Sequence, residues 1–326
     1  MTNETPTTTS PRFLSSDELR AALPIELAVD ALERRFMTSA PAELEGTPRT
    51  VVRVPGRPIG DDAEMLLMPA HGHEGAGLKL VSIVRGNPAR GLPMIQGVYV
   101  LLAPDDMTPE LMIDGAALTG LRTAAVSALA TRQLARPDSR NLVLFGAGAQ
   151  AAAHVDAMRA VLPIEHVTVV GSSAASPRAA ALVARLLAAG VDATVGDRTA
   201  VAQADVVCTC TTSMAPVFAD QDLPAGVHVN AIGAYRLDMC EIPAGSLARA
   251  LLVVESVAAT LAEAGDVVDA IDSGALPAGG FAFELHDLLN GVAGRDDEVQ
   301  ITVFKSVGLA VEDLIVARAA ADALAG

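Results

Sequence analysis

Short apolar runs separated by turn residues follow one another between about residues 49 and 114. Gly, Pro and Asp bound these runs, a pattern that is typical of strands joined by tight turns. No helical pattern separates the runs, so we expect them to pair in an antiparallel or mixed sheet. The predicted strands are Val51–Val54, Glu64–Met68, Leu78–Val84, Gly97–Leu102 and Glu110–Ile113.

Helices are predicted before and after these strands in the sequence. Ser15 and Glu18 have the spacing of a capping box ahead of a short helix. A second helix is expected from Pro24, because apolar residues then recur at helical spacing. From Gly115 to Ala135 small and apolar residues predict one long helix, which must end before Pro137.

After this helix, runs rich in Val, Ile and Leu alternate with helical segments. Such runs are typical of parallel strands covered on both faces. The predicted fold class is therefore α/β: a doubly wound parallel-sheet (Rossmann) dinucleotide domain plus a smaller α+β domain. The six predicted parallel strands lie at 142–145, 167–171, 191–195, 205–210, 228–232 and 251–254.

A chain of 326 residues has room for two domains. We expect residues 1–123 with 303–326 to form the smaller domain and residues 124–302 the Rossmann domain. The final segment, Gln300 to Gly326, contains a strand-like Ile301–Phe304 and a helix. We assign it to the first domain, since a dinucleotide unit needs no strand beyond its sixth. The active site is expected in the crevice between the domains, beyond the carboxyl ends of the parallel strands.

The first predicted parallel strand leads into the turn Gly146-Ala147-Gly148 and then into an alanine-rich helix. Glycines let the backbone approach a pyrophosphate, and the unpaired N–H groups of a helix N-terminus face its negative charge. Ala151 occupies the third small position of the pattern. A Gly-x-Gly turn alone is weak support, but in this strand–helix alternation it predicts a dinucleotide site.

The end of the second parallel strand bears on the choice of cofactor. NAD-preferring domains usually carry an acidic residue there, which holds the ribose 2′-hydroxyl. Here Gly171-Ser172-Ser173 follows the strand. Ser172 and Ser173 can bind a 2′-phosphate and Arg178 can supply charge, whereas the alternative makes them ordinary loop residues before a helix. We expect NADP(H) to be favoured over NAD(H).

Charge and composition narrow the classes of function. A net charge of −16 argues against nucleic-acid binding. No apolar run approaches the roughly 20 residues of a membrane span, and Met1–Pro11 lacks the apolar core of a signal peptide. We therefore expect a cytoplasmic protein with a small-molecule substrate, no nucleic-acid partner and no membrane partner.

The cysteines and histidines give no strong metal signal. Cys208, Cys210 and Cys240 do not suggest a disulfide framework. A single C-x-C pair is more often buried packing than a metal site, and His71-Gly72-His73 is interpreted as a solvated loop. We expect no metal.

Four segments together are far more specific than the glycine turn. On these segments the chain, from about Arg12 to its C-terminus, resembles the ornithine cyclodeaminase/mu-crystallin family. Members of that family are typically dimers built through the non-nucleotide domain and act on small α-amino or α-imino acids, so a homodimer is expected. The segments are Thr47-Pro48-Arg49 with Leu67–Ala70, Gly77–Leu80, Leu121–Ala125 before Phe145–Gln150, and Ile301–Gly308 with Ala310, Glu312 and Asp313.

The resemblance implies that Arg49, Lys79 and Arg122 hold the substrate carboxylate. Guanidinium groups bind a carboxylate through two hydrogen bonds, and an ammonium adds a compact charge. Lys79 lies among apolar neighbours, and a buried lysine needs a counter-charge, which favours a functional role. The alternative for Arg49, beside Pro48, is a surface turn residue.

Further site residues follow from the same resemblance. Ser306 and Glu263 are expected near the substrate, and Asp266 is expected to be structural. The expected cofactor contacts are Thr123, Gly146, Gly148, Ala149, Gln150, Ser172, Ser173, Arg178, Thr211, Thr212 and Val307.

Two departures from the cyclodeaminases disfavour cyclisation of ornithine. Cyclodeaminases that resemble this chain carry an Asp and a Glu where Tyr235 and Leu66 stand. The cyclisation calls for a carboxylate base. Tyrosine titrates about six pH units above a carboxylate, so it cannot serve at neutral pH, and leucine cannot serve at all.

The segment Ala234–Ile242 instead resembles the mu-crystallin-type ketimine reductases, although these usually have Pro at Leu237. A protonated cyclic imine is already an electrophile, so the enzyme mainly has to hold the carboxylate and present C2 to the nicotinamide. Lys79 and Tyr235 are candidates to stabilise or relay the imine proton; the alternative for Tyr235 is packing against the ring.

We therefore expect an NAD(P)H-dependent reductase of cyclic ketimine carboxylates. Its product would be L-proline from 1-pyrroline-2-carboxylate, L-pipecolate from the six-membered analogue, or both. Two alternatives stay open: an ornithine cyclodeaminase or alanine-dehydrogenase-like oxidoreductase, and a non-catalytic mu-crystallin-like binder of a small ligand. The three cations argue against an apolar ligand, because buried charges without an anion are costly.

Overall fold

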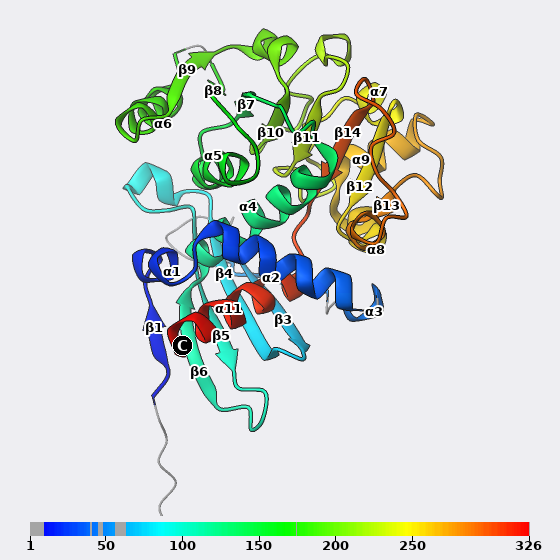
Figure 1. Ribbon diagram of the computed structural model, residues 1–326. Helices are drawn as coiled ribbons and strands as arrows, with labels where there is room; N and C mark the ends of the chain where they lie inside the picture. The colour runs from blue at the N-terminus through cyan, green and yellow to red at the C-terminus, as the bar shows by residue number, and fades with distance from the viewer. Residues whose placement is uncertain (1–9, 40, 45–47, 56–62, 174, 326) are drawn as a thin grey trace, which may run out of the picture. The chain divides into compact units, whose positions relative to one another are not determined.

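The computed structural model describes residues 10–325 except 40, 45–47, 56–62 and 174. The chain divides into two compact units (Figure 1). Unit 1 comprises Met1–Pro24, Gly46–Thr119 and Ala310–Gly326, and unit 2 comprises Ile25–Glu45 and Gly120–Leu309. None of the helices in the described ranges has the length and apolar character needed to cross a membrane.

Unit 1 is built on a six-stranded sheet of order β1-β6-β5-β4-β3-β2. β1 pairs with β6 in parallel and the other neighbours are antiparallel, which confirms the predicted mixed sheet. Helix α1 begins after the predicted capping box at Ser15. The elements are β1 (Arg12–Leu14), α1 (Ser16–Ala22), β2 (Thr50–Arg53), β3 (Ala63–Gly72), β4 (Gly75–Val84), η1 (Asn87–Arg90), β5 (Ile95–Leu102), β6 (Pro109–Asp114) and α11 (Ala310–Ala325).

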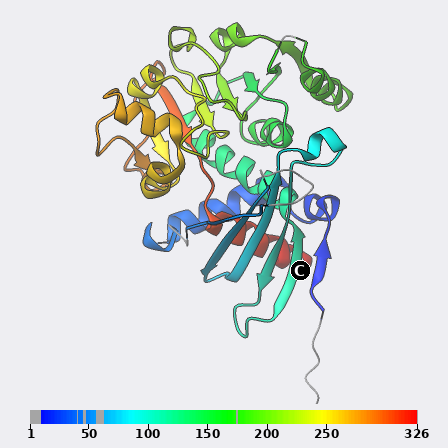
Figure 2. The ribbon, with the colours of Figure 1, turned by 180° about the vertical axis from the view of Figure 1, so that it is seen from behind.

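One face of this sheet is covered by α11, which packs against β3, β4 and β5. Figure 1 shows the helix in front of the strands, and Figure 2, from behind, shows the strands in front of it. Side chains alternate between the two faces of a strand. Buried Lys79 and Tyr99 are cross-strand partners on the α11 face.

Unit 2 is built on an eight-stranded parallel sheet of order β13-β12-β14-β11-β10-β7-β8-β9. The strand order reverses between β7 and β10, as in a doubly wound fold. The predicted Rossmann domain is therefore confirmed. Its strands are β7 (Asn141–Phe145), β8 (His166–Val170), β9 (Asp192–Gly196), β10 (Val206–Thr209), β11 (His228–Ala231), β12 (Ala250–Val254), β13 (Phe283–Glu284) and β14 (Ile301–Lys305).

Helices connect and cover these strands (Figure 1). The long predicted helix is α4, which ends at Leu134, three residues before Pro137. The helical elements are α2 (Ile25–Thr38), α3 (Pro41–Leu44), α4 (Gly115–Leu134), α5 (Ala149–Val161), α6 (Pro177–Ala188), η2 (Arg198–Gln203), η3 (Asp220–Asp222), α7 (Ala244–Ala248), α8 (Val257–Glu263), α9 (Gly265–Asp272) and α10 (Leu285–Leu289).

The C-terminal segment differs from the sequence-based expectation. Strand β14 lies between β11 and β12 in the sheet of unit 2, and only α11 belongs to unit 1. The boundary expected between residues 302 and 303 would cut this strand. All five residues of β14 are buried, which a central strand covered on both faces requires. The expectation that six earlier strands complete the sheet was wrong.

Helix α2 also lies outside the domain in which its sequence position had placed it. It belongs to unit 2 and packs against α5 and α10. The His286 ring on α10 lies 2.9 Å from the Phe36 carbonyl oxygen, through Nδ1. The apolar spacing predicted the helix but could not say which core its apolar face would cover.

Candidate active site

The glycine turn has the geometry that a pyrophosphate requires. Gly146 follows β7 with φ of +102°, and a Cβ there would lie 2.5 Å from the carbonyl oxygen of Cys210. Gly148 is the N-cap of α5 and makes no side-chain cap. A Cβ on Gly148 would meet no atom within 4 Å. The N-terminus of α5 therefore opens onto space that an anion can occupy.

Two predicted cofactor contacts carry unsatisfied polar atoms beside this turn. Thr123 on α4 and Gln150 in the first turn of α5 each have a buried side-chain oxygen with no hydrogen-bond partner among the described residues. Buried polar atoms normally find partners. These two oxygens and the uncapped helix therefore fit a bound dinucleotide.

A buried histidine joins α4 and α5 beneath these residues. Nδ1 of His154 donates to the carbonyl oxygen of Gln150 at 2.9 Å, so Nε2 accepts from the Ser127 hydroxyl at 3.1 Å. Burial lowers the pKa of His154 to about 4. The ring is therefore neutral at physiological pH and serves as a fixed link between the two helices.

The carboxyl end of β8 carries the residues predicted to choose the cofactor. Ser172, Ser173 and Arg178 are all exposed. The N-cap of α6 is Ser176, whose hydroxyl accepts from the Ala179 N–H. Ser172 and Ser173 therefore do not serve as the helix cap.

A buried carboxylate, that of Glu241, ties together the loops that follow β10 and β11. Glu241 accepts hydrogen bonds from the backbone N–H groups of Thr211 (2.7 Å), Gly233 (2.6 Å) and Ala234 (3.1 Å). It also accepts from the Thr209 hydroxyl at 2.9 Å. Burial raises the pKa of Glu241, an effect that the charge of Lys305 opposes. The carboxylate fixes Thr211 relative to the loop after β11.

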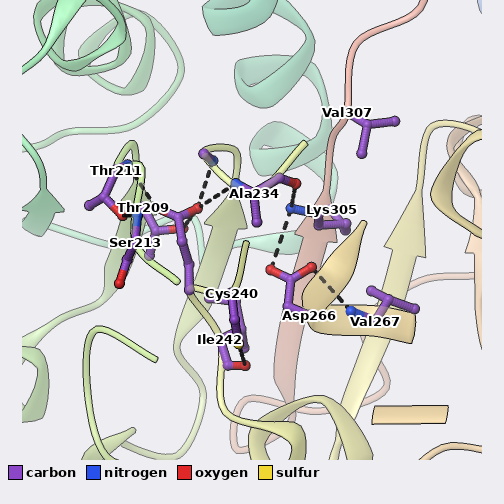
Figure 3. Close-up of polar contacts among 12 residues, drawn as sticks. Thr209, Thr211, Ser213, Ala234, Cys240, Ile242, Asp266, Val267, Lys305 and Val307 are labelled. Carbon is purple, nitrogen blue, oxygen red and sulfur yellow. Dashed lines mark hydrogen bonds and ion pairs between the residues drawn. The ribbon is translucent and has the colours of Figure 1, made fainter. Parts of the chain in front are cut away.

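Lys305 holds the same loop from the other side. Its Nζ donates to the carbonyl oxygen of Ala234 at 2.6 Å and lies 3.4 Å from Oδ2 of Asp266 (Figure 3). Burial raises the pKa of Asp266, and the charge of Lys305 opposes this rise only in part. The peptide groups on both sides of Ala234 are thus bonded to buried charged groups. Tyr235 follows at once and is half-buried.

A second buried carboxylate shapes the turn after β14. Glu255 accepts from the Ser306 hydroxyl and from the N–H groups of Val307 (3.1 Å) and Gly308 (2.7 Å). Gly308 has φ of +83°, and a Cβ there would overlap the guanidinium of Arg122. The structure thus brings Arg122, Ser306 and Val307 together in unit 2.

Three other predicted residues of unit 2 lie at strand and helix ends. Thr211 is half-buried and its hydroxyl accepts from the Ser213 N–H, whereas Thr212 is exposed. Glu263 ends α8 and is half-buried.

Lys79 has its counter-charge within unit 1. Its Nζ lies 2.7 Å from Oδ2 and 3.0 Å from Oδ1 of Asp313, and both residues are buried. Asp313 stands in the first turn of α11. The predicted need for a counter-charge is therefore met by helix α11. Arg49 is half-buried and directly precedes β2.

Sequence reasoning missed the buried groups that hold these residues in place. No role was assigned to Glu241, Glu255, Lys305 or Asp313, all of which are buried. Two of them carry the signal that drew attention to Lys79, a charge among apolar neighbours: Lys305 follows Val303-Phe304 and Asp313 precedes Leu314-Ile315. Applied throughout, that signal would have found both.

The cysteines are free thiols, and burial raises the pKa of Cys208 to about 12. Cys208 is fully buried in β10, as the packing interpretation expects. In the part of the chain that the structure describes, no three His, Cys, Asp or Glu side chains are grouped as a metal site would need.

Comparisons with known proteins agree with this architecture. The chain is 40% identical over 261 residues to a Delta(1)-pyrroline-2-carboxylate reductase of Paracoccus denitrificans, covering 77% of this chain and 80% of the relative. The Thermococcus litoralis Delta(1)-pyrroline-2-carboxylate reductase, solved in complex with NADH and L-proline, superposes with a TM-score of 0.87 at 29% identity, covering 96% of this chain and 97% of the other.

An archaeal alanine dehydrogenase dimer with bound NAD superposes with a TM-score of 0.86 at 27% identity, covering 97% and 96% of the two chains. The family model described as "Ornithine cyclodeaminase/mu-crystallin family" matches residues 10–326. This chain belongs to the ornithine cyclodeaminase/mu-crystallin family.

Proposed function

We propose that this protein is an NAD(P)H-dependent imino-acid reductase that converts a cyclic ketimine carboxylate into the corresponding cyclic amino acid. The substrate is 1-pyrroline-2-carboxylate, giving L-proline, or its six-membered analogue, giving L-pipecolate, or both. The observation that carries the proposal is the full-length likeness to a reductase that binds NADH and L-proline together. The glycine turn and the open N-terminus of α5 support it independently.

The residues of the chain divide the work of this reaction. Arg49, Lys79 and Arg122 hold the carboxylate, which fixes C2 of the ring. The bound nicotinamide, when reduced, supplies a hydride to C2. The nitrogen carries the proton of the iminium, so reduction of the C=N bond gives the neutral amine directly.

Proton exchange at that nitrogen is the proposed task of Lys79 and Tyr235. Ser306 and Glu263 complete the substrate contacts. The Ser306 hydroxyl donates to Glu255, so it meets the substrate as an acceptor.

Within this proposal NADP(H) is favoured over NAD(H). The carboxyl end of β8 presents Ser172, Ser173 and Arg178, all exposed, and no acid follows the strand directly. A 2′-phosphate needs donors and positive charge there. Thr123, Gly146, Gly148, Ala149 and Gln150 bind the rest of the dinucleotide, with Thr211, Thr212 and Val307 near the nicotinamide.

The alternatives have less support. Leu66, at the position of a cyclodeaminase carboxylate, packs in an apolar cluster with Val81 and Ile83. The sequence identity to alanine dehydrogenase is 28% over 307 residues, lower than the 40% shared with a Delta(1)-pyrroline-2-carboxylate reductase. A non-catalytic binder has less support because the similar curated and solved relatives are named reductases.

We also propose a homodimer formed through unit 1, which would serve as the substrate-binding and dimerisation domain. The face of the sheet opposite α11 carries a continuous apolar row, one residue from each of five strands. Phe13 and Leu78 in it are exposed, and the other three are half-buried. Such a surface is typical of an interface between copies. The row is Pro69, Leu78, Val100, Met112 and Phe13.

A cytoplasmic location completes the proposal. Reduced thiols and a nicotinamide-dependent reaction suit a reducing compartment.

A panel of substrates tests the function. Purified protein is mixed with NADPH or NADH and with each of the two cyclic imines, and loss of the reduced-nicotinamide absorbance is followed. We expect oxidation of the cofactor with at least one imine, faster with NADPH at equal concentration. Ammonia release from ornithine with catalytic NAD, or reduction of pyruvate with ammonia in place of the imines, would favour the alternatives. Tight cofactor binding without any turnover would favour the binder.

A further inference from the structure

Two fully buried charges meet in unit 1 between segments far apart in the chain. Lys79 lies on β4 and Asp313 on α11, and both carboxylate oxygens lie within 3.0 Å of Nζ. Taking two charges out of water is costly, and their mutual attraction offsets this cost only with good geometry. The pair is therefore a weak source of stability, so its presence calls for another explanation.

The alkyl chain of Lys79 is also held on both sides. Its cross-strand partners are Met68 on β3 and Tyr99 on β5, and both are buried. The Tyr99 hydroxyl fills the space where a side chain on residue 77 would stand, which is why Gly77 is required there. Lys79 thus leaves its strand in one direction, between two packed neighbours.

Asp313 then fixes the end of that side chain. An ammonium has three N–H donors, and the two oxygens of one carboxylate can engage at most two of them. The bond to Asp313 therefore also sets the direction of the third. Burial and the charge of Asp313 raise the pKa of Tyr99, so Tyr99 stays neutral and adds no second negative charge beside Lys79.

We propose that Asp313 is a positioning residue: through its buried ion pair it orients the Lys79 ammonium toward the carboxylate of the cyclic imino acid. This inference rests on the proposed function, in which Lys79 binds that carboxylate. Asp313 itself touches no substrate. Its effect should appear in substrate binding and not in cofactor binding.

The chain offers a matched control on the same helix. Arg318 of α11 pairs with Glu110 of β6 at 2.8 Å and also joins helix to sheet, but Glu110 is exposed. A purely structural role for Asp313 would make Asp313→Asn resemble Glu110→Gln in kind, with a larger loss of stability because the buried Lys79 is left unpaired. Both would then lower the unfolding temperature without a selective effect on either ligand.

The experiment compares Asp313→Asn, Asp313→Glu, Glu110→Gln and Lys79→Met in the full chain. For Asp313→Asn we expect KM for 1-pyrroline-2-carboxylate to rise by roughly tenfold or more, because a misplaced contact loses orientation. The dissociation constant for the reduced cofactor should change by less than about twofold, since its contacts lie elsewhere. Asp313→Glu should recover part of the loss. Adding Asp313→Asn to Lys79→Met should raise KM no further, because both act through one group.

Two results would overturn the inference in distinguishable ways. If Lys79→Met raises KM but Asp313→Asn only lowers the unfolding temperature, as Glu110→Gln does, then Asp313 is structural and the proposed function stands. If Lys79→Met itself leaves KM unchanged, Lys79 does not bind the substrate. That result removes the basis of the inference and contradicts the proposed site as well.

Discussion

Arg122 owes its position in unit 2 to a single glycine. Gly308 leaves no side chain where the guanidinium lies, and Glu255 holds its backbone N–H at 2.7 Å. The φ of +83° is one that L-residues rarely adopt. Backbone conformation and side-chain placement are therefore coupled at this residue.

Replacing Gly308 with alanine should consequently disturb Arg122. The added methyl group overlaps the guanidinium, so we expect KM for the imine to rise by roughly tenfold, as for other displaced contacts. The positive φ should also cost about 1–2 kcal/mol of unfolding free energy. Steady-state kinetics and urea denaturation measure the two effects.

Gly190→Ala is the matched control for this substitution. Gly190 has φ of +77° and a Cβ there would meet nothing within 4 Å. It should lose stability to a similar extent and keep its KM. Equal KM values for the two variants would show that Gly308 does not govern Arg122.

For single residues, the sequence predicted which charged side chains matter better than it predicted the groups that they bind. Lys79 was expected to need a counter-charge, and Asp313 supplies it. That partner is 234 positions away, and no local pattern links the two. Glu255 was missed for the same reason, because the Gly308 N–H that it binds is 53 positions away. Glu241 binds Gly233 nearby, but its bond to the Thr211 N–H spans 30 positions.

Among the elements, the unit of strand β7, glycine turn and helix α5 was predictable because its signal is local. The positions of Gly146 and Gly148 follow from the chemistry of a pyrophosphate, and the structure has both as expected. The order of strands in the sheet was less predictable. All residues of β14 are buried, as are those of β11 beside it, so the local pattern alone could not place β14 between β11 and β12.

Alanine in place of Gly146 should selectively weaken cofactor binding. Its Cβ would lie 2.5 Å from the Cys210 carbonyl oxygen, so the turn must move away from β10. We expect the dissociation constant of the reduced cofactor to rise by roughly tenfold or more, which corresponds to about 1.4 kcal/mol. Quenching or enhancement of nicotinamide fluorescence on titration measures it.

Gly274→Ala separates this effect from backbone strain. Gly274 has φ of +77° after α9, and an added Cβ would meet no atom within 4 Å. The variant should lose stability but bind cofactor normally. A dissociation constant for Gly146→Ala within error of that for Gly274→Ala would refute the assignment of the turn.

For the whole molecule, two buried histidines make stability depend on pH. Burial lowers the pKa of His154 to about 4 and that of His228 to about 3, from 6.5. Below pH 6.5 these two histidines bind protons in the unfolded chain, whereas in the folded chain they stay neutral until the pH is much lower. The free energy of unfolding should therefore decrease as the pH is lowered below 6.5, by up to about 1.4 kcal/mol per pH unit for each histidine.

The buried carboxyl groups act in the opposite direction at lower pH. Burial raises the pKa values of Glu241 and Asp266, so the folded chain gains protons there before the unfolded chain does. The loss caused by the histidines should accumulate between pH 6.5 and about 4, the unfolded and folded pKa values of His154. Urea denaturation of the unaltered chain and of His154→Gln across this range checks the account. The variant should show a shallower slope, and an unchanged slope would contradict it.

The two-unit organisation was predicted in outline because the hydrophobic period changes from short strands to strand–helix alternation. The boundaries of the two units were not predicted, because helix α2 and strand β14 belong to unit 2 although they lie wholly or mostly outside the expected residues 124–302. Both errors concern which core an apolar segment covers. That choice depends on contacts between distant parts of the chain.

The central claim is that a hydride passes from a reduced nicotinamide to C2 of a cyclic imine whose carboxylate the chain holds. Its most direct test uses NADPH and NADH, each carrying deuterium at both C4 positions, with 1-pyrroline-2-carboxylate and its six-membered analogue as substrates. We predict L-proline or L-pipecolate with a single deuterium, located at C2 by mass spectrometry and NMR. Failure to form either amino acid, or product without deuterium at C2, would contradict the account.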